Sequence, residues 1–191
     1  MLRALTAPGC VVTVPHHLAA QSDTLLMVGN VGPSAQGCEV TRSHGLEGAH
    51  RLALGPVGGR FSDLAGPNAK DVIFVQTYSF FGKQTPVGER VLAALKKKYS
   101  DIKGPNDITP AVGYTNAYDV MHLTALASKK TGSTNGDAIR QGYYKIDQYD
   151  GLIKTYNKPF SPKNHDAIGQ DDYVWTQFID GKIVPVGTGG K

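Results

Sequence analysis

The clearest hydrophobic pattern starts at residue 61 and contains a short run of consecutive apolar residues, Val72–Val75. Such a run is typical of a strand that is buried on both faces of an α/β sheet. The apolar spacing within residues 61–65 predicts a short helix before it, which Gly66 and Pro67 end. The pattern therefore predicts a helix that leads directly into a core strand.

A cluster of hydroxyl-bearing and aromatic side chains follows this run without a break, in the sequence AKDVIFVQTYSFF at residues 69–81. Buried strands of an α/β sheet present ligand-binding groups at their carboxyl ends. We therefore expect a core strand that ends at a cleft, with the ligand site directly after Val75.

Three helices are predicted after the aromatic cluster. Thr85 caps the first, Pro86 opens it, and Lys96–Lys98 end it. Thr115 or Asn116 caps the second. Its predicted apolar face comprises Ala117, Val120, Met121, Leu123, Leu126 and Ala127, and it ends at Lys129, Lys130 and Gly132.

The third helix is capped within the STNGD segment and runs from Asp137 to about Lys145. Beyond it, residues 172–186 read as two strands joined at Asp180 and Gly181, a dipeptide that favours a two-residue hairpin turn. The predicted order is strand, three helices and a hairpin, which indicates an α/β fold.

The first fifty residues lack such regularity. Residues 1–7 have the pattern of a helix that Pro8 and Gly9 end, and residues 25–28 that of a short strand. Because Pro8 and Gly9 also interrupt the opening apolar stretch, we expect no export signal there. No run of 18 or more apolar residues occurs, so we expect no transmembrane helix.

Composition narrows the class of protein. With 40% hydrophobic and 19% charged residues among 191, the chain is neither disordered nor collagen-like. The net charge is +4, and the one local basic run, Lys96–Lys98, fits the solvated last turn of a helix, where cations offset the helix dipole. We expect no nucleic-acid partner.

Cysteines and histidines gather near the N-terminus, but their spacing does not predict a metal site. Structural zinc requires paired ligands at short, regular spacing, which is absent here, so chance clustering is favoured. Cys10 and Cys38 form either one disulfide or two free thiols. The residues concerned are Cys10, His16, His17, Cys38, His44 and His50.

No cofactor is expected either. The glycine-rich stretches at 55–60 and 187–191 lack the preceding strand and the following Ser or Thr that a phosphate-binding loop requires.

An ordered set of segments resembles the C-terminal part of type I periplasmic solute-binding proteins of the branched-chain amino acid class. The segments are GGRFSDLAG at 58–66, DVIFVQTYSF at 71–80, YTNAYDVMHLTALA at 114–127, GSTNGDAIR at 132–140, YDGLIKTYN at 149–157 and HDA at 165–167. They cover about two-thirds of the chain as an ordered set, although no single segment is diagnostic.

The resemblance implies part of a two-lobe α/β fold whose lobes close on a ligand, without the sheet of the N-terminal lobe. It divides the chain into an atypical segment at 1–57, the C-terminal portion of a binding protein at 58–186, and a tail at 187–191. Residues 11–51 depart from the family pattern, which an insertion, a changed reading frame or a misassigned start would each explain.

The resemblance also implies a function. It predicts the substrate-binding component of an ABC transporter for branched-chain amino acids or related small amides or carboxylates, truncated in this chain. The implied partners are a small-molecule ligand and a membrane permease, and the implied location of an intact member is the periplasm. Such proteins bind without catalysing a reaction and need no cofactor.

Four residues are candidate ligand contacts on this pattern. Tyr78, Ser79 and Phe80 are expected on the hinge-side wall of the cleft, and Tyr118 is expected to face it. A tyrosine hydroxyl directly after a core strand needs a polar partner, which favours a binding role for Tyr78. For Tyr118, simple packing at a helix start is the slightly favoured alternative. The acidic group that would hold an ammonium is not placed.

A small α/β hydrolase is the alternative function. His165 and Asp166 would then serve as an acid-base pair. Neighbouring loop positions point apart and no nucleophile accompanies them, so a turn is the favoured interpretation and no catalytic residue is assigned.

Overall fold

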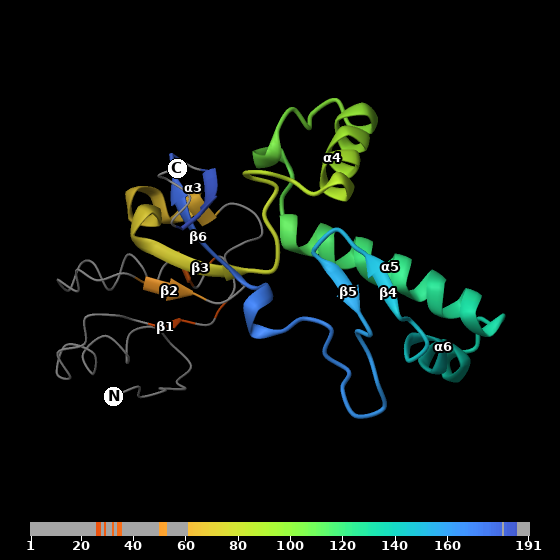
Figure 1. Ribbon diagram of the computed structural model, residues 1–191. Coiled ribbons are helices and arrows are strands. Elements are labelled where there is room, and N and C mark those ends of the chain that lie inside the picture. The colour runs from red at the N-terminus through yellow and green to blue at the C-terminus, as the bar shows by residue number, and fades with distance from the viewer. Residues whose placement is uncertain are drawn as a thin grey trace. The chain divides into compact units, whose positions relative to one another are not determined.

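The computed structural model describes residues 26–27, 29, 32, 34–35, 50–52, 61–180 and 182–186 (Figure 1). The chain divides into two compact units. Unit 1 comprises Met1–Gln76 and Trp175–Lys191, and unit 2 comprises Thr77–Val174. The expected N-terminal helix, the glycine-rich stretches and most of the cysteine and histidine cluster lie outside the described residues. The boundary at residue 57 stays a prediction.

Unit 1 contains a five-stranded sheet in the order β1-β2-β3-β6-β7 (Figure 1). The strands β1, β2 and β3 are parallel neighbours, whereas β6 and β7 form an antiparallel hairpin. Their bounds are Leu26–Met27, His50–Leu52, Val72–Gln76, Val174–Ile179 and Lys182–Pro185. The structure confirms the predicted strands and hairpin, and it adds β2, which has too few apolar residues to form a recognisable pattern.

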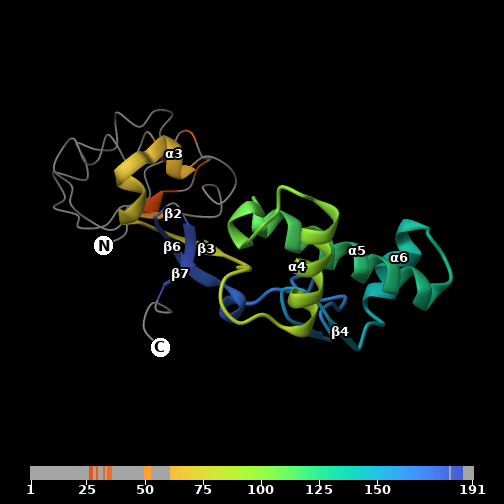
Figure 2. The same ribbon diagram turned by 90° about the horizontal axis from the view of Figure 1, so that it is seen from above.

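Phenylalanine packing joins the helix α3 (Phe61–Ala65) to the sheet of unit 1. Phe61 is fully buried and stacks on Phe178 of β6, with ring centroids 5.3 Å apart, while Phe74 of β3 lies 4.9 Å from the same ring. Figure 2 shows α3 beside these strands. The predicted helix is confirmed, but the chain continues past Gly66 as the 3-10 helix η3 (Gly66–Asp71).

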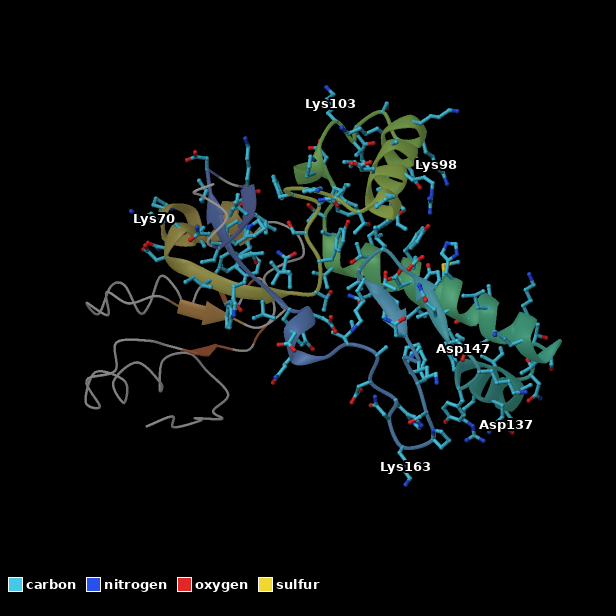
Figure 3. All side chains as sticks on the ribbon, in the orientation of Figure 1. Lys70, Lys98, Lys103, Asp137, Asp147 and Lys163 are labelled. Atoms are coloured by element: carbon cyan, nitrogen blue, oxygen red, sulfur yellow. The ribbon has the colours of Figure 1, made fainter. Side chains whose placement is uncertain are left out.

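The first helix of unit 2, α4 (Pro86–Lys98), begins and ends as predicted. The Thr85 side chain accepts a hydrogen bond of 3.1 Å from the Gly88 N–H, which satisfies one free donor of the first turn. Val91 and Leu95 are buried on the inner face. Lys98 projects outward from the last turn (Figure 3), in agreement with a solvated basic run.

The second helix, α5 (Ala111–Thr131), begins earlier than predicted. Neither Thr115 nor Asn116 is its cap, because both lie inside the helix and donate to the Val112 carbonyl, at 3.2 and 2.8 Å. The end is as predicted, with Gly132 in the left-handed conformation at φ 66°.

The apolar face predicted for α5 is partly wrong. Leu123 and Ala127 are buried, but Val120 and Met121 are 57% and 72% exposed, and Ala117 is also exposed. Apolar residues lie on more than one side of this helix, so the sequence pattern alone does not identify the side that packs.

The third helix, α6 (Gly136–Tyr143), packs against α5. The Asn135 side chain caps it by accepting from the Asp137 N–H at 3.0 Å, and Gly142 is buried. A Cβ at Gly142 would lie 2.9 Å from Ala127 Cα and nearer still to Ala127 O. Glycine therefore allows the two helix backbones to approach closely.

A hairpin that the sequence pattern did not reveal follows α6. Its strands are β4 (Gln148–Asp150) and β5 (Thr155–Asn157), which pair in antiparallel fashion with Tyr149 opposite Tyr156. Two further 3-10 turns, η4 (Pro105–Asp107) and η5 (Gln170–Asp172), lie in the connections of unit 2. Among the described residues, no helix has the length and apolar character required to cross a membrane.

Candidate functional site

Tyr78 is buried just beyond the end of β3, and its hydroxyl donates a hydrogen bond of 2.5 Å to Gln84 Oε1. The polar partner expected for this hydroxyl is therefore a protein side chain. Burial, with a smaller effect from the charge of Asp119, raises the pKa of Tyr78 to about 12. A Cβ at Gly88 would lie 2.6 Å from the Tyr78 hydroxyl, so the glycine makes room for this contact.

The loop that holds Ser79 and Phe80 is closed by one amide side chain. Gln84 Nε2 donates to the carbonyl oxygens of Ser79, Phe81 and Gly82, at 3.4, 3.2 and 3.2 Å. Ser79 Oγ is half-buried and accepts from the Phe81 N–H, whereas Phe80 is buried at 2% exposure. The segment after β3 therefore has a defined conformation of its own.

A continuous series of aromatic rings, here called the aromatic row, extends through unit 2. Successive ring centroids are 4.4 to 6.5 Å apart, within or near the range of favourable ring contacts. Tyr118 is half-buried and His122 is exposed. The aromatic row comprises Tyr78, Phe80, Tyr114, Tyr118, His122, Tyr149 and Tyr156.

The carboxylate of Asp119 lies beside the aromatic row and is 1% exposed. It accepts hydrogen bonds from the Leu152 N–H at 2.6 Å, the Ile153 N–H at 2.9 Å and the Tyr156 hydroxyl at 3.0 Å. Burial, followed by the negative charge of Asp119, raises the pKa values of Tyr156 and Tyr149. Asp119 thus fixes the β4-β5 turn to α5, and its acceptor capacity is used by the protein.

The structure brings three of the four candidate residues into one aromatic row. Tyr78 and Phe80 are in direct edge-to-face contact at 5.0 Å, and Tyr114 connects them to Tyr118. Ser79 belongs to the same loop but not to the row. Contact between these four candidate residues and a ligand stays a prediction.

Several members of the aromatic row were missed by sequence reasoning. Tyr114 and His122 lie four residues before and after the predicted Tyr118 on α5, a spacing that would have predicted a common face. The cross-strand pair of Tyr149 and Tyr156 had no comparable signal, because the β4-β5 hairpin was not predicted.

A second polar arrangement lies at the end of β3 within unit 1. Gln76 is 1% exposed, and its Nε2 donates to Thr176 Oγ1 at 3.3 Å, which in turn donates to the Phe74 carbonyl at 3.0 Å. Within the described part of the chain, only Gln76 Oε1 and Ser34 Oγ are buried side-chain polar atoms without a hydrogen-bond partner. Gln76 occupies the position directly after Val75, where the sequence predicted a site.

His165 and Asp166 lie in irregular backbone directly after a turn at residues 162–163. His165 Nε2 pairs with the Tyr144 hydroxyl at 3.0 Å, and the Asp166 N–H donates to the Asn164 side chain. The His165 ring therefore contacts a tyrosine and not the Asp166 side chain.

Comparison with solved structures identifies the fold. A type I periplasmic binding protein from Bordetella pertussis Tohama I is similar with a TM-score of 0.78 and 18% identity, over 92% of this chain and 48% of that one. The leucine-binding protein LivK from Thermotoga maritima MSB8 gives a TM-score of 0.73 and 16% identity, over 91% and 46%.

The branched-chain amino acid transporter substrate-binding protein LivJ from Streptococcus pneumoniae, in complex with isoleucine, gives a TM-score of 0.71 and 18% identity, over 94% and 48%. No family model matches the sequence. No curated protein matches it either.

The chain therefore has the fold of type I periplasmic binding proteins over about half the length of these structures, as the resemblance predicted. The similarity covers more of the chain than the two-thirds on which the sequence resemblance rests. The similar structures are solute-binding proteins.

Proposed function

We propose that this chain is part of the substrate-binding component of an ABC transporter, with a branched-chain amino acid or a related small amide or carboxylate as ligand. The observation that carries the proposal is the shared fold, with TM-scores of 0.71 to 0.78 to structures that include leucine and branched-chain amino acid binders. A periplasmic location and a membrane permease as partner follow from the same proposal.

The aromatic row supports the proposal at the level of chemistry. Binding a branched aliphatic side chain needs apolar surface with polar groups around it, and no reacting group. Tyr114 and Tyr118 are half-buried and stack with centroids 6.5 Å apart, and His122 continues their surface. We propose that Tyr118 contacts the ligand directly, while Tyr78, Ser79 and Phe80 shape the neighbouring wall.

The hydrolase alternative receives less support. An acid-base pair needs the two groups within hydrogen-bond reach of each other or of a substrate proton, but the ring of His165 pairs with Tyr144. We therefore propose a binding protein and no enzymatic activity.

Titration of the full chain with small ligands tests this function. We expect leucine, isoleucine or valine to bind in calorimetry or ligand-observed NMR, and Tyr118→Ala to weaken binding about tenfold, because about 1.4 kcal/mol of ring contact is lost. Tyr173→Ala is the matched control, because Tyr173 is 43% exposed and outside the aromatic row. Absence of binding across amino acids, amides and carboxylates would contradict the proposal.

A further inference from the structure

We propose that Gln76 is a ligand-binding residue whose side-chain oxygen accepts a hydrogen bond from an N–H group of the ligand. This inference rests on the proposed binding function and makes its ligand class narrower. It favours ligands with an ammonium or amide group over simple carboxylates. The supporting observations all lie within unit 1.

The hydrogen bonds around Thr176 determine which end of the Gln76 amide is available. The Thr176 hydroxyl has one proton and donates it to the Phe74 carbonyl, so toward Gln76 it can only accept. Gln76 therefore directs Nε2 at Thr176, as observed at 3.3 Å. This arrangement leaves Oε1, an acceptor, without a protein partner.

A buried acceptor without a hydrogen-bond partner, such as Gln76 Oε1, is unusual and unfavourable. Buried side-chain oxygens nearly always have a hydrogen-bond partner, and an unpaired one destabilises the folded chain. A residue of the same shape without the oxygen, such as methionine, would avoid this cost. A ligand N–H would supply the missing donor, which explains an amide at this position.

The position of Gln76 in the sheet is that of a ligand-binding group. It is the last residue of β3, and parallel strands present ligand groups at their carboxyl ends. The register aligns Met27, Leu52 and Phe74 in one row across β1, β2 and β3. Gln76 therefore lies two residues beyond this row.

Ser34 provides an independent observation at the same edge. A Cβ on Gly29 would lie 3.2 Å from Ser34 Oγ, so these two residues are close together. Gly29 lies two residues after Met27, and Gln76 lies two residues after Phe74, which is in the same row as Met27. One strand separates β1 from β3, so the two positions are about 10 Å apart along the edge. The two buried side-chain polar atoms that lack a partner among the described residues thus lie at or near the carboxyl ends of parallel strands in one sheet.

The chemistry of these atoms selects the ligand class. Gln76 Oε1 can only accept, so a carboxylate, which also only accepts, gains nothing from it. An ammonium or an amide N–H gains a hydrogen bond and removes the cost of the unpaired acceptor. Because Gln76 is 1% exposed, the ligand must displace the groups that cover Oε1.

Three ligands that share one carbon skeleton provide the test. Leucine carries an ammonium and a carboxylate, 4-methylpentanamide carries an amide, and 4-methylpentanoate carries only a carboxylate at pH 7. For the full chain we expect leucine and the amide to bind at least about tenfold more tightly than 4-methylpentanoate, the worth of one buried hydrogen bond.

Gln76→Met should reduce this preference to less than about threefold without lowering the melting temperature. Gln148→Met is the matched control, since Gln148 is exposed in unit 2, and it should leave the preference unchanged. Gln76→Leu removes the same acceptor with a smaller apolar side chain, so it should reduce the preference in the same way. This second variant provides the test if Gln76→Met does not fold.

The possible results separate the two proposals. If no ligand of the panel binds, the proposed function and this inference both fail. If leucine and 4-methylpentanoate bind equally well, or if Gln76→Met keeps the tenfold preference, the role of Gln76 fails while the binding function stands. A lowered melting temperature with an unchanged preference would assign Gln76 a purely structural role.

Discussion

At the scale of single residues, Asp119 has the largest predicted effect on stability. Its buried carboxylate accepts two backbone N–H groups and the Tyr156 hydroxyl. We expect Asp119→Asn to lower the free energy of unfolding by about 3 kcal/mol, because a neutral amide cannot accept all of these bonds and directs donors at other donors. Urea unfolding followed by circular dichroism measures the change.

An exposed carboxylate provides the control for this variant. Asp147 is 78% exposed, and its ion pair with Lys130, at 3.7 Å, is on the surface, where such pairs contribute little. Asp147→Asn should therefore change the free energy of unfolding by less than about 0.5 kcal/mol. Equal stability of the two variants would show that Asp119 is not the connection between α5 and the β4-β5 turn.

Gly142 tests the close packing of α5 and α6. We expect Gly142→Ala to destabilise the chain by about 1–3 kcal/mol, because the added methyl group would overlap the Ala127 backbone, which cannot rotate away. At Gly136, in the same helix, an added Cβ would meet nothing within 4 Å. Gly136→Ala should therefore not lower the melting temperature. Equal melting temperatures of the two variants in thermal unfolding would contradict the close contact at Gly142.

At the scale of elements, an ion pair connects η5 to the turn between β4 and β5. The Lys154 ammonium contacts the Asp172 carboxylate, which also accepts from the Gly169 N–H at 2.7 Å. Although burial acts to raise the pKa of Asp172, the hydrogen bonds from Lys154 and Gly169 and the charge of Lys154 outweigh it and lower the pKa.

This shift predicts the pH dependence of the attachment. Because the folded pKa is below the unfolded value of about 3.9, the stabilisation is present above the unfolded value and is lost as the pH falls through the folded pKa. Melting temperatures of wild type and Asp172→Asn should therefore differ at pH 7 and converge toward pH 3. A difference that stays constant with pH would exclude this ion pair as the cause.

At the scale of the whole molecule, exposed apolar side chains on α5 predict self-association. Val120 and Met121 are adjacent, and more than half of each side chain is in contact with solvent. Because exposed apolar surface favours association, we expect the sedimentation coefficient to rise with concentration and Met121→Lys to reduce this rise. Ile179→Lys, which changes an exposed residue in unit 1, is the control and should have a smaller effect.

The sequence by itself determined the local structure wherever one signal dominated. Val72–Val75 predicted β3, Thr85 and Pro86 predicted the start of α4, and Asp180 predicted the turn between β6 and β7, where its φ is 49°. The cap and the turn act between near neighbours in the chain, through a hydrogen bond within one turn or steric limits on the backbone, whereas the apolar run acts through the burial of consecutive side chains.

Only the tertiary structure decided the features that depend on distant partners. It identified the packed side of α5, formed the β4-β5 hairpin around the carboxylate of Asp119, and completed the aromatic row with Tyr149 and Tyr156. It also left Gln76 Oε1 unpaired through Thr176, one hundred residues away. The sequence located the end of β3 as the place of interest, but long-range hydrogen bonds determine which groups remain available there.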